Sequence, residues 1–210
     1  MNMKSPVALV LGLAACFGST GCFEFLKPVH TTARQFVLTP LPATSPPAAA
    51  AGSIPVGVGQ VRLAAYLFTK SVVVRRGTNE IDYLPTIFWA ERLGDNFQRV
   101  LAANLAIQLP TDEIRLSAWR SEDVAAEVYV AVDQFDVDAD GRAVLVARWR
   151  FLSPGGSKTL KSGECRLVRQ GPPPESDAAG AIATLSELLA ALSDQLAQAI
   201  KEAVPVGPSM

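Results

Sequence analysis

The spacing of hydrophobic positions changes near residue 88. Before this point, short apolar and β-branched runs at residues 56–63, 71–76 and 79–83 are typical of strands. After it, the pattern repeats every three or four residues, which places the side chains on one face of a helix. The pattern predicts a helix from about residue 89 to 109, because Pro110 cannot continue it. The positions on this face are Trp89, Leu93, Phe97, Val100, Leu101, Asn104 and Leu105.

The second half of the chain alternates between apolar and polar residues. Apolar residues alternate from Val128 to Val132, but Phe135 falls in the opposite parity. A shift of one residue in the alternation would place every later apolar side chain on the other face of the strand. An extra residue, inserted as a β-bulge, keeps these side chains on the original face. The sequence therefore predicts a hairpin over about residues 126–153 with a bulge near Asp133.

A last strand is expected at residues 158–168, followed by a helix that Ser176 or Asp177 can cap. This helix is predicted to run from about residue 177 to 203. We favour burial of its apolar stripe within the domain over contact with a neighbouring subunit. The stripe comprises Ile182, Leu185, Leu188, Leu189, Leu192, Leu196 and Ile200.

Strands and helices with apolar faces to bury predict an α+β fold. We expect a two-layer domain over residues 34–204, in which two long helices, about 89–109 and 177–203, pack on a mostly antiparallel sheet. Residues 205–210 are expected to form a disordered tail. A length of 210 residues with 49% hydrophobic residues suits one domain plus appendages. The formal net charge of −1 gives no reason to propose a nucleic-acid partner.

The N-terminal residues 1–21 have the features of a lipoprotein signal peptide, and residues 22–33 are expected to be a tether. Lys4 precedes a short apolar stretch that is too short to span a bilayer, which takes roughly 20 apolar residues. Small residues lead into both Cys16 and Cys22, so either could be acylated and become the mature N-terminus. The local pattern favours Cys16, whereas the length of the signal favours Cys22, which we choose.

Few residues could carry chemistry. The single histidine, His30, lies in the predicted tether, and Cys165 would be the one thiol left if Cys22 carries lipid. If Cys16 is acylated instead, Cys22 and Cys165 could pair in an oxidising periplasm. Residues 136–141 imitate the start of a calcium loop, but its twelfth position is Ala147, and Asp-Gly is typical of a hairpin turn. We therefore expect no catalytic residue, metal site or cofactor.

Five short motifs, taken together in their order, resemble a known family. The chain is similar to the auxiliary lipoproteins of ABC-type transport systems, a family that includes the lipoprotein C of the paraquat-inducible system. One departure is Arg92, where the family leads us to expect proline after Trp-Ala-Glu. The motifs are Val-Gly-Val-Gly-x-Val-x-Leu at 56–63, Tyr66-Leu67, Val74-x-Arg76, Trp89-Ala90-Glu91, and Arg99-Val100-Leu101-x-x-Asn104-Leu105.

This resemblance implies a non-enzymatic accessory that is held at a membrane by its N-terminal lipid. It implies partners that contain lipid-shuttling MCE domains, together with the components of an ABC-type transporter, and it allows a homo-oligomer. A phenylalanine follows either cysteine, and under the sorting rule of enterobacterial lipoproteins this indicates the outer membrane, with the domain facing the periplasm. The alternative is a lipoprotein that itself binds a lipid or glycan in a pocket between sheet and helices.

The resemblance also points to six recurring positions. They could form a ligand or partner surface, but we favour a structural role in which tryptophans anchor the core and polar groups hold the helix to nearby backbone. The six are Trp89, Glu91, Arg99, Asn104, Arg148 and Trp149.

Overall fold

The computed structural model describes residues 32–42, 55–109, 111, 113–116 and 119–204. The chain divides into two units, residues 1–32 and 33–210, and the fold described here belongs to the second. The predicted signal peptide, both acylation candidates Cys16 and Cys22, nearly all of the tether and the predicted tail at 205–210 lie outside the described residues.

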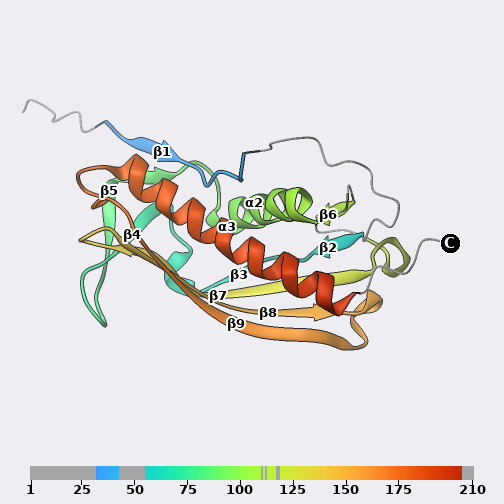
Figure 1. Ribbon diagram of the computed structural model, residues 1–210. Coiled ribbons are helices and arrows are strands. Elements are labelled where there is room, and N and C mark those ends of the chain that lie inside the picture. The colour runs from blue at the N-terminus through green and yellow to red at the C-terminus, as the bar shows by residue number, and fades with distance from the viewer. Residues whose placement is uncertain (1–31, 43–54, 110, 112, 117–118, 205–210) are drawn as a thin grey trace, which may run out of the picture. The chain divides into compact units, whose positions relative to one another are not determined.

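The described residues of the second unit form a curled sheet and two helices (Figure 1). The helices are α2 (Leu93–Gln108) and α3 (Ala178–Ala203). Short 3-10 turns connect other elements: η3 (Ala65–Leu67), η4 (Ser121–Asp123) and η5 (Pro154–Gly156). The strands are β1 (Arg34–Phe36), β2 (Val56–Val58), β3 (Arg62–Leu63), β4 (Ser71–Arg75), β5 (Ile81–Trp89), β6 (Ile114–Leu116), β7 (Ala126–Asp138), β8 (Arg142–Leu152) and β9 (Thr159–Gln170).

Strand β7 is the centre of the sheet. On one side it pairs antiparallel with β8, which pairs antiparallel with β9. On the other side it pairs in parallel with β2, then β3, then β4 along its length. Outside these, β4 pairs antiparallel with β5, while β1 joins β5 and β6 joins β2 in parallel.

The sheet is therefore mixed, and the prediction of a mostly antiparallel sheet was wrong. Five strand pairings are parallel and three are antiparallel. The physical reason lies in the connections, because parallel neighbours need a crossover rather than a hairpin. The chain between β2 and β7 supplies that crossover, since it includes the β4–β5 hairpin and α2.

The predicted β7–β8 hairpin forms, and its bulge is confirmed by a register shift between Val132 and Gln134. The turn between the strands depends on Asp138, whose carboxylate accepts the backbone N–H groups of Asp140 and Arg142. Gly141 has a φ of 86°, a conformation that glycine adopts without steric cost. This turn explains the Asp-Gly pair that imitates a calcium loop.

Helix α2 begins at Leu93, four residues later than the predicted start at Trp89. Trp89 ends strand β5, and its N–H donates to the carbonyl of Lys70 at 2.7 Å. The backbone of Trp89 is thus hydrogen-bonded as part of the sheet, although its side chain extends the apolar face of the helix. Helix α3 matches its prediction, with the Asp177 side chain accepting the Gly180 N–H as an N-cap.

Both helices pack on one face of the sheet and bury their apolar stripes in a single core. Polar side chains tie the helices to the segment after β1. Asn96 accepts the Leu38 N–H at 2.6 Å, and Asn104 accepts the Leu41 N–H at 2.8 Å. Because both asparagines are buried, these bonds satisfy groups that would otherwise be costly to remove from water.

Candidate functional site

The six positions taken from the resemblance lie in two places. Trp89, Glu91, Arg99 and Asn104 belong to the junction of β5 with α2 or to α2 itself, whereas Arg148 and Trp149 are neighbours on β8. Each place lies beside a surface hollow: a recess at the start of α2 and a groove over the outer face of the sheet, away from the helices.

The first hollow, the β5–α2 recess, has a volume of about 440 Å³. Trp89 lies at its base and is 6% exposed, while Phe68 stands at its edge and is 74% exposed. The charged residues in its lining are Lys70, Glu91, Arg92 and Asp95. The recess is mainly apolar because six large hydrophobic side chains contribute to it. They are Val61, Leu63, Leu67, Phe68, Trp89 and Leu93.

Glu91 and Arg99 form an ion pair that joins the bend before α2 to the exposed side of the helix. Both side chains are partly exposed, so solvent screens their attraction and the pair adds little stability. Asn104 lies apart from the recess, fully buried, where it also donates to Ser193 of α3 at 3.2 Å. The four positions near α2 therefore do not converge on one point.

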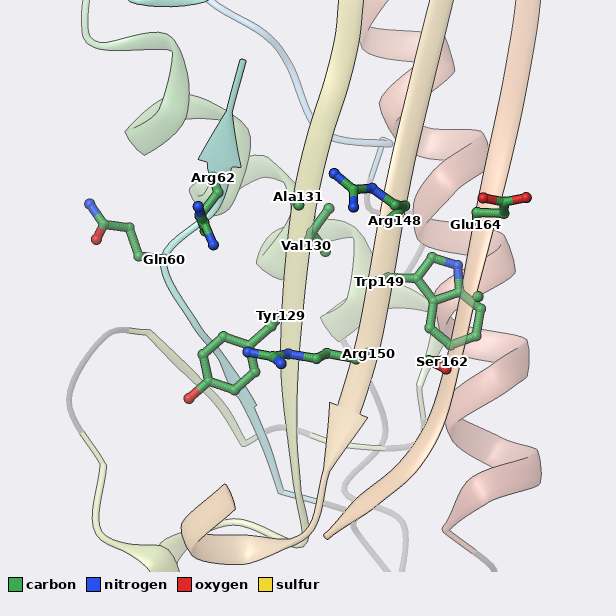
Figure 2. Close-up of a pocket in the computed structure, with 11 residues that line it drawn as sticks. Gln60, Arg62, Tyr129, Val130, Ala131, Arg148, Trp149, Arg150, Ser162 and Glu164 are labelled. Atoms are coloured by element: carbon green, nitrogen blue, oxygen red, sulfur yellow. The ribbon is translucent and has the colours of Figure 1, made fainter. Parts of the chain in front are cut away.

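The second hollow, the outer groove, has a volume of about 550 Å³ and crosses β7 and β8 (Figure 2). Side chains alternate along β8, so Arg148 and Arg150 point to the outer face. Trp149 packs against the core and stacks on Phe151 with ring centroids 4.7 Å apart. A Cβ on Gly163 of β9 would come within 2.5 Å of the Trp149 ring, so the absence of a side chain there makes room for the indole.

Arg148 binds the carboxylate of Asp133 through two hydrogen bonds of 2.8 Å. This guanidinium lowers the pKa of the Asp133 carboxyl group below its usual value. Beside it, Arg150 lies over the ring of Tyr129, 5.6 Å from the centroid. Burial, followed by the hydrogen bond to Glu127, raises the pKa of Tyr129.

A third group of polar residues surrounds Asp136 in β7, which is buried. Its carboxylate accepts hydrogen bonds from Arg75 at 2.7 Å, from the Tyr66 hydroxyl at 2.8 Å and from Gln134 at 2.8 Å. Burial, with Asp136 next in importance, raises the pKa of Tyr66. The partners saturate the carboxylate, so this cluster braces the strand beside the bulge.

The last features of the described residues concern metal ligands, the Cys165 thiol and membrane-spanning helices. No three His, Cys, Asp or Glu side chains within it are placed to hold a metal ion. Burial raises the pKa of the Cys165 thiol, which reduces the reactive thiolate form. Within the same residues, no helix has the length and apolar character needed to cross a membrane.

Comparison with known proteins identifies the family. Residues 36–197 match the family described as the ABC-type transport auxiliary lipoprotein component. The chain belongs to this family. Its members are auxiliary transport lipoproteins and are not known as enzymes, and a lipoprotein of this kind is anchored to a membrane with its domain in the periplasm. The matched range includes both hollows and the Asp136 cluster.

Solved structures share the fold of this auxiliary lipoprotein. An uncharacterized protein is 20% identical with a TM-score of 0.64, over 80% of this chain and 99% of its own. A protein from Xanthomonas campestris is 16% identical with a TM-score of 0.62, over 82% of this chain and 93% of its own. At such identities the likeness concerns the fold alone. No curated protein is detectably similar in sequence.

From the sequence, Arg148 and Trp149 were named as candidate site residues, and none of the other residues that line the outer groove was. Alternation along 142–152 places Arg150 on the same face as Arg148 and opposite to Trp149, but it does not mark Arg150 as a site residue. Arg62 comes from β3, which joins β7 through a parallel pairing that no local pattern predicts. Nothing in the sequence indicates that these three arginines share a groove.

Proposed function

We propose that this lipoprotein is a non-enzymatic accessory of an ABC-type lipid transport system that contains MCE-domain proteins and helps to maintain the outer membrane. Lipid on Cys22, with Cys16 as the alternative, holds it at the outer membrane, and the folded domain docks on a partner in the periplasm. The family match over residues 36–197 is the observation that carries this proposal. The anchor would raise the local concentration of the domain near its partner.

We place the docking contact at the β5–α2 recess. Its occupant would be an apolar side chain of the MCE-domain partner, since hot spots of protein interfaces are aromatic or apolar anchors seated in pockets. Phe68 supports this choice, because it is the most exposed of the large hydrophobic side chains among the described residues. The charged groups around it, Lys70 and Arg92 among them, would form the polar rim that such interfaces have.

We predict that Phe68→Ser abolishes recovery of the MCE-domain partner when the anchored protein is used as bait on detergent-solubilised membranes. The substitution removes an aromatic side chain whose burial against the partner contributes about 2 kcal/mol to binding, enough for a loss of affinity of at least tenfold. Val168→Ser on β9 is the matched control, because Val168 is 44% exposed and lies outside the recess. Unchanged recovery with Phe68→Ser would show that docking uses another surface.

Anchoring is tested separately. Cys22→Ser should release the protein into the soluble periplasmic fraction, because the acyl chains provide the membrane affinity. The measurement is fractionation of cells followed by mass spectrometry of the N-terminal peptide. Cys16→Ser is the matched control and should leave the protein in the membrane fraction. Acylation that persists in Cys22→Ser and disappears in Cys16→Ser would instead identify Cys16 as the anchor.

The second candidate function is binding of a lipid or glycan by the domain itself. The apolar lining of the β5–α2 recess is the observation that favours it. Against it, the space between sheet and helices is filled by buried side chains, which include Phe97, Leu101 and Leu189. Repeated recovery of lipid alone in the bait experiment, without an MCE-domain protein, would favour this candidate over docking.

A further inference from the structure

The outer groove differs from its surroundings in the way its arginines are partnered. Figure 2 shows the side chains of Arg62 and Arg148 on the two sides of Ala131 on β7, and that of Arg150 beside Tyr129, two residues away on the same strand. Ala131 is small, so it leaves the middle of the groove open. The three side chains come from β3 and β8, which flank β7 on its two sides.

Among the residues that the structure describes, only one of these arginines has an acidic partner. Arg148 is neutralised by its two hydrogen bonds to Asp133. Among the described residues, no carboxylate lies within ion-pair distance of Arg62 or of Arg150. Glu164 is the one carboxylate in the lining of the groove, and it is the neighbour of Arg148 across the β8–β9 pairing.

Arg150 contacts an aromatic ring instead of a carboxylate. Its guanidinium lies over the Tyr129 ring, and the Tyr129 hydroxyl donates to Glu127 at 3.0 Å. Glu127 is 6% exposed and also accepts the N–H of Gly155 at 3.0 Å. Among the described residues, the Arg150 guanidinium contacts the Tyr129 ring and has no hydrogen-bond acceptor, so its N–H edges are open to one.

Arg62 and Arg150 line the same hollow, and neither has a carboxylate partner among the described residues, so both would attract an anion that entered it. The planar N–H fork of arginine matches the oxygens of a phosphate group, and such bonds are about twice as strong as neutral ones. We propose that the outer groove binds a phosphate group between Arg62 and Arg150. The group could belong to a phospholipid headgroup or to free phosphate, since both present the same oxygens. This inference does not depend on docking at the β5–α2 recess.

The test is calorimetric titration of the full chain in micelles of a neutral detergent at low ionic strength, with two probes. One probe is inorganic phosphate, and the other is the same micelle doped with phosphatidylglycerol. We expect saturable binding that Arg62→Gln and Arg150→Gln each weaken by about tenfold, as expected when one charge-assisted hydrogen-bonding partner is lost. Both side chains are exposed, so the unfolding temperature should not change.

Arg34→Gln is the matched control. Arg34 carries the same charge and lies 5.0 Å from the centroid of the Phe36 ring, but it belongs to β1 and not to the groove. Its substitution should leave binding unchanged. Binding of inorganic phosphate would mean that the phosphate group suffices, and binding only of phosphatidylglycerol would assign the site to a lipid headgroup. The proposal is overturned by an absence of saturable binding with both probes, or by an equal loss in Arg34→Gln.

Discussion

Replacing Asp136 by leucine is expected to lower the free energy of unfolding by about 3 kcal/mol, because it leaves a partly buried arginine without its counter-charge. Asp136 side-chain exposure is 2% and that of Arg75 is 26%. The substitution also removes the acceptor of the Tyr66 hydroxyl. Unfolding in urea, followed by tryptophan fluorescence, measures the change.

Asp133→Asn is the matched control, since Asp133 lies three residues earlier on β7 and also binds an arginine, Arg148. Its side chain is 45% exposed, so its loss should change stability little. A double variant, Arg75→Met with Asp136→Leu, should recover part of the lost stability because no unpaired charge remains. A loss in Asp136→Leu no larger than in Asp133→Asn would refute the bracing role of this cluster.

The elements with local periodicity were predictable from the sequence. Helix α3 and the β7–β8 hairpin each contain their own pattern, cap or turn, and the bulge followed from a change of parity at Phe135. The start of α2 was predicted too early because Trp89 is apolar at helical spacing, although its backbone belongs to β5. A side-chain pattern reports which face is buried, and it does not report which partner the backbone N–H uses.

The parallel pairings could not be predicted in this way. Strands β2, β3 and β4 join β7 at residues far apart in the chain, as in the pairings of Val56 with Ala126 and of Val74 with Val137. Such pairings are decided by burial of the whole sheet against the helices and not by any turn. The Asp136 cluster and the outer groove depend on these pairings, which is why both became visible only in the folded chain.

Asn104 illustrates how a resemblance can point to a residue without giving its role. Its side chain is fully buried, accepts the Leu41 N–H at 2.8 Å and donates to Ser193 at 3.2 Å. It thus connects three parts of the domain: α2, α3 and the segment after β1. Ser193 also donates to the carbonyl of Leu189 within α3, so the bond from Asn104 uses its remaining acceptor capacity.

We expect Asn104→Leu to lower the free energy of unfolding by about 2–4 kcal/mol, because it leaves the Leu41 N–H and the Ser193 hydroxyl oxygen without this partner while roughly keeping the volume of the side chain. Hydrogen exchange gives a specific readout: the Leu41 amide should lose protection more than the Leu38 amide, which Asn96 binds. Gln108→Ala is the matched control, since this amide also reaches α3, at Asp194, but does so at the surface. If the two variants lose equal stability, or if the Leu41 amide keeps its protection, the buried asparagine does not hold this segment to the helices.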